Sequence, residues 1–154
     1  GKGENRVITG FLSQFTTMKP ALQATIHRAT KERDDLILEG VHVAPQLLDL
    51  EEARTRGIVV PVMLATMERS ALRKQLKRRG RETTERKASR YLDALDDIWE
   101  MQSYLLSEAD NSGIPIITNW HLDSTTREIL NIVMAKIMKR YPPGTGDEPQ
   151  PWQQ

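Results

Sequence analysis

A carboxylate, a glycine and a histidine follow directly on a short aliphatic run in the first third of the chain. Residues 36–38 read Leu-Ile-Leu, and Glu39, Gly40 and His42 come immediately after them. A short aliphatic run is typical of a buried strand in a parallel sheet. Open α/β sheets bind their ligands at the carboxyl ends of such strands, where Glu39 could deal with a metal ion that carries phosphate. These residues therefore indicate half of a phosphotransfer site.

The phosphate-binding half is missing from this sequence. The chain contains no Gly-x-x-x-x-Gly-Lys-[Ser/Thr] motif, whose backbone amides would cradle a nucleotide. It does contain a strongly basic segment, because residues 69–90 hold ten lysines and arginines against two glutamates, a local net charge of +8. The rest of the chain carries −7, which gives the overall net charge of +1. Such a segment attracts anions, either phosphate esters or nucleic acid.

Composition limits the class of protein. A length of 154 residues is enough for one domain, and the absence of cysteine excludes disulfides and thiolate zinc sites. No apolar stretch approaches the roughly 18 residues of a membrane span, so no membrane association is expected. The chain begins without the apolar core of a signal peptide and without methionine. We therefore expect a cytoplasmic protein and a processed or trimmed chain.

Alternating helices and strands predict an α/β fold with a parallel sheet flanked by helices. Strands are expected over residues 36–39, 58–64 and 114–117, with Pro61 placing the second one at an edge or bulge. Helices are expected over residues 20–33, where Pro20 suits the first turn, 45–56, 68–79, 85–110, and from Asp123 or Ser124 to 140. We expect one domain over residues 1–140, and a disordered tail over residues 141–154 because proline, glycine and glutamine dominate there.

Several motifs in order resemble the 2-phosphoglycerate kinase family of P-loop kinases. The segment Leu-Ile-Leu-Glu-Gly-Val-His-Val-x-Pro, residues 36–45, is the most telling of them. The others, spread over residues 7–137, are Gly10-Phe11 and Gln14, the arginine-rich segment, Tyr91-Leu92, Gln102-x-Tyr104-Leu105, and Gly113-Ile114-Pro115-x-Ile117-x-Asn119. The resemblance implies a P-loop kinase fold of which this chain is the C-terminal portion, without the ATP-binding loop.

The resemblance also implies a gap in the sheet. If the strand order is 2-3-1-4-5, as in many P-loop kinases, the absent P-loop strand lies between residues 36–39 and residues 58–64. The two remaining strands would then not be neighbours. We expect such a chain to pair with a complementary P-loop-bearing polypeptide, to swap segments with a second copy, or to repack.

The resemblance assigns roles to particular residues, each with a plainer alternative. Glu39 would be the acid beside the magnesium-bound phosphates of ATP, or a strand-end acid that caps a neighbouring element. His42 would bind substrate, or make ordinary hydrogen bonds. Asn119 would contact the nucleotide base, or serve as a turn residue. Residues 68–90 would form the mobile lid, with phosphate ligands among Arg73, Arg78, Arg79 and Arg81, or a solvated basic face.

Three functions remain open. The first is ATP-dependent transfer of the γ-phosphoryl group to a small phosphorylated hydroxy acid, with magnesium as cofactor and with this chain inactive alone. The second is a non-catalytic interaction module, or half of a split P-loop protein. The third is a nucleic-acid-binding protein, which the absence of aromatic residues from the basic segment before Tyr91 argues against.

Overall fold

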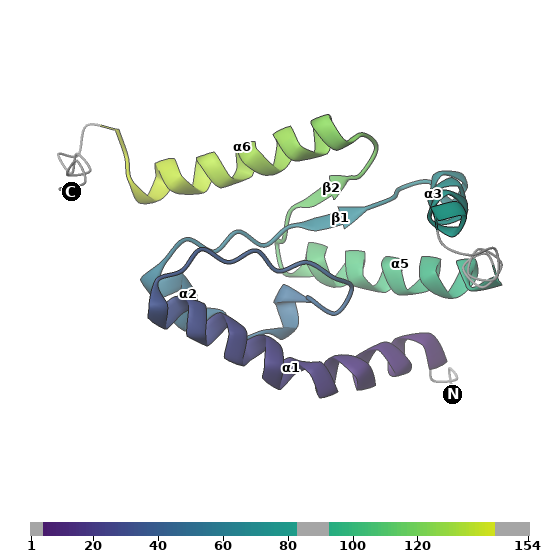
Figure 1. The fold of residues 1–154 in the computed structure, drawn as a ribbon, viewed down its shortest axis with the longest axis horizontal. Coiled ribbons are helices and arrows are strands. Elements are labelled where there is room, and N and C mark those ends of the chain that lie inside the picture. The colour runs from purple at the N-terminus through teal and green to yellow at the C-terminus, as the bar shows by residue number, and fades with distance from the viewer. Residues whose placement is uncertain (1–4, 83–92, 144–154) are drawn as a thin grey trace.

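The computed structural model describes residues 5–82 and 93–143, and it places a small parallel sheet between layers of helices (Figure 1). Strands β1 (Met63–Ala65) and β2 (Ile116–Thr118) pair in parallel, with Leu64 opposite Ile117. Helix α6 (Leu122–Arg140) packs on β2, and α5 (Leu95–Asn111) contacts both strands. In Figure 1, α6 covers one face of the sheet and α5 the other, with α1 (Arg6–Glu32) beyond α5. The expected α/β class is confirmed.

Helix α1 is much longer than the helix expected from residue 20. It begins at Arg6, where the Asn5 side chain accepts hydrogen bonds from the backbone N–H groups of Val7 and Ile8 at 3.1 and 3.3 Å. Pro20 lies inside the helix, so its placement in a first turn is wrong. Burial of Phe11 and Phe15 explains the extension, because tertiary packing of an apolar face outweighs an interior proline.

The interior proline yields a first prediction. Pro20 is exposed and cannot donate to the carbonyl of Thr16, which an i to i−4 hydrogen bond would otherwise satisfy. We expect Pro20→Ala to raise the free energy of unfolding by about 1–3 kcal/mol, since the gain in helix propensity exceeds the added entropy of the unfolded chain. Urea unfolding measures the change, with the exposed neighbour Lys19→Ala as the control. A lower free energy of unfolding for Pro20→Ala would contradict the prediction.

The aliphatic run at residues 36–39 is not a strand, which corrects the first element expected from the sequence. The backbone is extended but pairs with nothing in the described parts of the chain. Ile37 is 93% exposed and Leu36 is 42% exposed, so the run is not buried either. A strand needs a neighbour that accepts its backbone hydrogen bonds, and the described residues provide none beside this run.

The other segments are helices or strands as expected, but they begin or end at other residues. The helix expected over residues 45–56 is split into η1 (Pro45–Leu47) and α2 (Glu51–Arg56), which ends at Gly57 as expected. Strand β1 begins only after Pro61, and β2 ends at Thr118 instead of 117. Helix α3 spans Arg69–Glu82. Residues 83–92, which include the first residues of the helix expected over 85–110, and the tail from residue 144 lie outside the described residues.

The core lies where α1, α5 and the loop before η1 meet. It is formed by the buried residues Phe11, Phe15, Ala44 and Leu105, with partly buried Met63, Met101 and Tyr104 packed against them. In the parts of the chain that the structure describes, no helix combines the length and apolar character that crossing a membrane requires.

Candidate functional site

The carboxyl ends of three extended segments point to the same end of the molecule. Strands β1 and β2 run in the same direction, and the unpaired run 36–39 runs with them (Figure 1). Thr66 and Asn119, which follow the paired strands β1 and β2, therefore lie at the same end of the sheet, where α3 also begins. Parallel chain direction brings together residues that are far apart in the sequence.

A half-buried amide clamp fixes the carboxyl end of β1. The side chain of Gln102, on α5, accepts a hydrogen bond from the Thr66 N–H and donates one to the Thr66 carbonyl, both at 3.0 Å. Thr66 is only 7% exposed, so these backbone groups depend on Gln102 for their partners. The sequence hinted at this role, because Gln102 is the polar residue within an otherwise apolar helical stripe.

The amide of Gln75 fastens α3 over the same edge. Its Oε1 accepts a hydrogen bond from the Thr66 hydroxyl at 3.1 Å, and its Nε2 donates to the Asn119 carbonyl at 3.4 Å. Leu72 and Leu76 are buried on the same helix. An ion pair between Arg69 and Asp96 joins the start of α3 to α5. Sequence reasoning did not single out Gln75, which sits in the middle of the basic segment.

Two of the four candidate lid arginines can be placed. Arg73 and Arg78 are exposed on α3, and neither forms an ion pair with a described residue. Arg79 and Arg81 belong to α3 as backbone, while their side chains lie outside the description. Gln75 holds α3 to Thr66 and Asn119, which follow β1 and β2. The helix that carries the exposed arginines is therefore fixed at the carboxyl end of the sheet.

Glu39 and His42 sit differently at the end of the unpaired run. Glu39 is exposed and makes no hydrogen bond or ion pair with the residues described. His42 stacks on Phe11, with ring centroids 5.6 Å apart and an angle of 11° between the planes, and its Nε2 lies 2.9 Å from Gln14 Oε1. His42 thus makes ordinary contacts, which was the alternative to a role in substrate binding. These contacts join its loop to α1.

The aromatic cluster behind His42 extends to α5. Phe11 meets Tyr104 edge to face at 6.4 Å. Burial raises the pKa of the Tyr104 hydroxyl, and the negative charge of Glu108 raises it further. Tyr104 therefore remains neutral and supports the loop that carries His42 and Glu39 through Phe11.

Asn119 is fixed by its backbone. Its N–H donates to the Ala65 carbonyl at 2.8 Å, and its own carbonyl accepts the Gln75 amide, while its side chain is exposed. Among the described residues, no hydrogen bond or ion pair joins this group to Glu39 or His42. Nor do the described histidines and carboxylates form a group of three that could hold a metal. A single carboxylate such as Glu39 still suits Mg²⁺ when phosphates supply further ligands.

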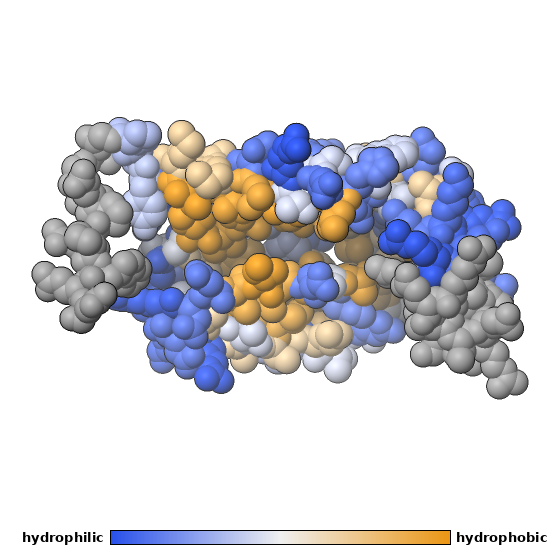
Figure 2. Space-filling view, turned by 45° about the horizontal axis from the view of Figure 1, so that its top comes forward, coloured by the Kyte–Doolittle hydropathy of each residue, from blue (hydrophilic) through white to orange (hydrophobic). Residues whose placement is uncertain are grey.

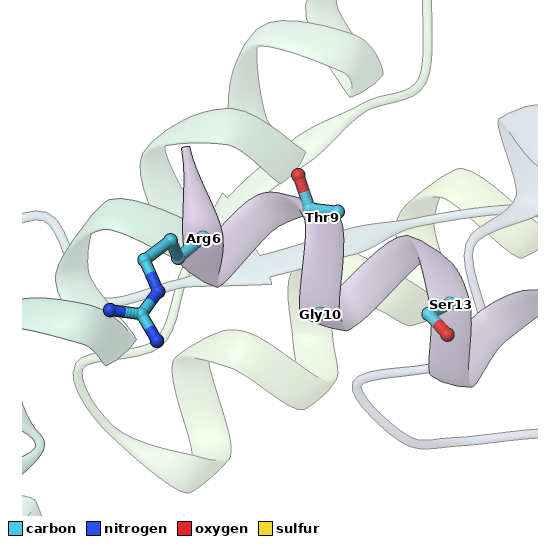
Figure 3. A pocket seen from close by; sticks show the side chains of 4 residues that line it. All are labelled: Arg6, Thr9, Gly10 and Ser13. Carbon is cyan, nitrogen blue, oxygen red and sulfur yellow. The ribbon is translucent and has the colours of Figure 1, made fainter. Parts of the chain in front are cut away.

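A shallow hollow of about 330 Å³ on α1 contributes nothing to this site. It is lined by Arg6, Thr9, Gly10 and Ser13, all from one helix. Figure 3 shows that the side chains of Arg6, Thr9 and Ser13 point in different directions instead of converging on one position.

The fold and the polar residues at the carboxyl ends of the strands indicate a class of protein. A parallel sheet flanked by helices, with polar residues gathered where the strands end, is consistent with part of a P-loop kinase fold. Known proteins with similar sequences agree with this class. The chain is homologous to archaeal proteins named 2-phosphoglycerate kinase, so the resemblance found in its motifs is confirmed.

Three relatives show the extent of the match. The protein of Methanopyrus kandleri is 31% identical over 137 residues, which are 88% of this chain and 42% of that protein. The protein of Pyrococcus furiosus is 32% identical over 137 residues, 87% of this chain and 44% of that protein. The protein of Pyrococcus horikoshii is 31% identical over 136 residues, with shares of 88% and 44%. The chain thus spans less than half the length of these relatives. No protein-family model and no solved structure matches it.

Proposed function

We propose that this chain is part of an ATP-dependent phosphotransferase that acts on a small phosphorylated hydroxy acid of the 2-phosphoglycerate type. The observation that carries the proposal is the similarity along 88% of the chain to proteins named 2-phosphoglycerate kinase. The attachment of the arginine-rich helix α3 to Asn119, at the carboxyl end of β2, supports it. Bound Mg-ATP would supply the phosphoryl group and part of the charge neutralisation.

Each residue has a role that its position allows. Glu39 is exposed and unpaired among the described residues, so its carboxylate is free to act as a magnesium ligand. Arg73 and Arg78 can bind phosphate oxygens through paired N–H groups and can stabilise negative charge on the group in transfer. Arg79 and Arg81, further along α3, are candidates for the same contacts.

The Nδ1 atom of His42 is left for substrate, since Nε2 is occupied by Gln14. Asn119 offers its side chain to a base.

A chimera tests the proposal. In it, this chain replaces the matched residues of the Pyrococcus furiosus relative, and ATP-dependent phosphorylation of 2-phosphoglycerate is measured. We expect the chimera to transfer phosphate and the 154-residue chain alone not to, because it lacks a phosphate-binding loop. Glu39→Gln and Arg73→Met should each lower kcat by about 100-fold.

The control is Lys136→Met, a charge loss at an exposed position of α6. It should leave kcat of the chimera within about twofold, since Lys136 is far from the carboxyl ends of the strands. Transfer by the chain alone would refute its inactivity. Unchanged kcat in both Glu39→Gln and Arg73→Met would refute the site.

A further inference from the structure

Two polar contacts on different sides of α3 fix the rotation of this helix about its own axis. On one side, Gln75 accepts a hydrogen bond from the Thr66 hydroxyl at 3.1 Å and donates one to the Asn119 carbonyl at 3.4 Å. On the other side, Arg69 forms an ion pair with Asp96 at the start of α5. Because successive residues of an α-helix are about 100° apart, Gln75 and Arg69 lie about 120° apart around α3.

Gln75 is the stronger of these two anchors. The side chains of Arg69 and Asp96 are 52% and 78% exposed, and ion pairs between exposed side chains contribute little. Helical spacing puts the buried Leu72 and Leu76 between the two anchors, but apolar contact is not directional. Gln75 is half-buried and its hydrogen bonds are directional, so its amide does most to set the rotation of α3.

This rotation places the two exposed arginines of α3 on different sides of the helix. Arg78 comes three residues after Gln75, and side chains at that spacing are neighbours on a helix surface. It therefore stands on the side that Gln75 joins to Asn119. Arg73 comes one turn after Arg69, on the side that faces α5. Figure 2 shows that the end of the molecule where α3 lies, at the right, is mostly hydrophilic.

Asn119 and Arg78 offer complementary groups to one ligand. The backbone of Asn119 is occupied by the Ala65 carbonyl and by Gln75, whereas its exposed side chain forms no hydrogen bond with a described residue. A carboxamide can both donate and accept, which suits the edge of a nucleobase. A guanidinium group suits phosphate. Base and phosphate are the two ends of a nucleotide.

We propose that Gln75 is a positioning residue, which holds α3 in the rotation at which Arg78 and Asn119 bind the phosphate and base ends of one nucleotide. This inference rests on the proposed function, since the nucleotide is the phosphoryl donor. Arg73, on the other side of α3, is left for the group in transfer and makes no contact with the part of the nucleotide that ADP contains. Methionine at position 75 would keep the approximate length of the side chain and lose both hydrogen bonds.

Cross-linking tests the orientation of α3 in the 154-residue chain, which contains no cysteine of its own. Arg78→Cys and Arg73→Cys are each combined with Asn119→Cys and treated with a short bis-maleimide. We expect the pair with position 78 to cross-link at least about fivefold faster, because its thiols stand on the same side of α3 and have the higher effective concentration. Gln75→Met should remove the difference. Equal rates in the two pairs, or a difference that survives Gln75→Met, would overturn the proposal.

Nucleotide affinity tests the consequence in the Pyrococcus furiosus chimera, by calorimetric titration with ADP. Gln75→Met and Arg78→Met should each weaken ADP binding about tenfold. The double variant should fall well short of the roughly hundredfold loss that independent effects would give, because Gln75 acts through Arg78. Arg73→Met should stay within about twofold, as should the control Lys74→Met, which removes an exposed charge from the side of α3 opposite its buried face.

These results separate the role of Gln75 from the proposed reaction. A chimera that shows the expected ADP affinities but transfers no phosphate would refute the reaction and leave the role of Gln75 intact. Losses that multiply fully in the double variant, an equal loss in Arg73→Met and Arg78→Met, or no ADP binding by the folded chimera would each overturn the role of Gln75. If the chimera does not fold, the same titrations are made on the chain co-expressed with the remaining polypeptide of that relative, with the same outcomes deciding.

Discussion

Phe11→Ala is expected to lower the free energy of unfolding by about 3–5 kcal/mol. Phe11 is 3% exposed and touches three other rings: Phe15 at 6.4 Å, His42 at 5.6 Å and Tyr104 at 6.4 Å. These contacts join α1, the loop after residues 36–39, and α5. Removing the ring leaves a cavity where three parts of the chain meet, so the cost includes both lost burial and lost packing. Chemical denaturation followed by far-UV circular dichroism measures the change.

A variant on the same helix provides the control. Met18→Ala removes a side chain that is 43% exposed on α1, and we expect it to cost less than about 1 kcal/mol. Phe11→Leu keeps most of the apolar volume and should lie between the two. Equal free energies of unfolding for Phe11→Ala and Met18→Ala would show that the aromatic cluster does not hold α1 to the rest of the molecule.

The sequence predicts the elements of this fold better than their pairing. Helical periodicity locates α5 and α6, and the β-rich runs contain the starts of β1 and β2, although β1 begins five residues later than expected. The start of α1 is missed, because Pro20 suggests a helix start locally while Phe11 and Phe15 are buried through contacts made elsewhere. The run at residues 36–39 has the composition of a buried strand, yet it is exposed. The composition of a segment shows that it is suited to a strand. Whether it forms one depends on a neighbouring strand, which lies elsewhere in the sequence.

Some features of the candidate site can likewise be predicted from the sequence, and others cannot. The basic segment predicts a helix, which α3 confirms. The aliphatic run predicts that Glu39 stands at the carboxyl end of a strand, but the run is unpaired, so the role of Glu39 stays a prediction. Gln75 is missed, because a glutamine among lysines and arginines looks like one more solvated residue. Its two hydrogen bonds, to the Thr66 hydroxyl and the Asn119 carbonyl, depend on the packing of α3 against the sheet. Such contacts between distant residues leave no periodic signal in the sequence.

Gln102→Leu is expected to lower the free energy of unfolding by about 2–4 kcal/mol. Leucine keeps the approximate volume of the side chain, so the loss comes from the Thr66 N–H and carbonyl, which are buried and lose both partners. Urea unfolding measures the change, and Ser103→Ala is the control. Ser103 is the next residue on α5, is exposed, and bonds only to the Trp99 carbonyl one turn earlier, so its loss should cost less than about 0.5 kcal/mol.

Gln102→Glu separates the two bonds of the clamp. The carboxylate can still accept from the Thr66 N–H but has no N–H to donate, and it brings negative charge next to the Thr66 carbonyl. We therefore expect this variant to be destabilised, and to recover part of the loss when the pH is lowered enough to protonate the new carboxyl group, which then donates to the carbonyl. The Leu variant should show no such recovery. If Gln102→Leu unfolds within about 0.5 kcal/mol of the unmodified chain, Thr66 has other partners and the clamp does not hold the end of β1. If it is destabilised as expected, one glutamine on α5 fixes the sheet edge to which α3 and its arginines are attached.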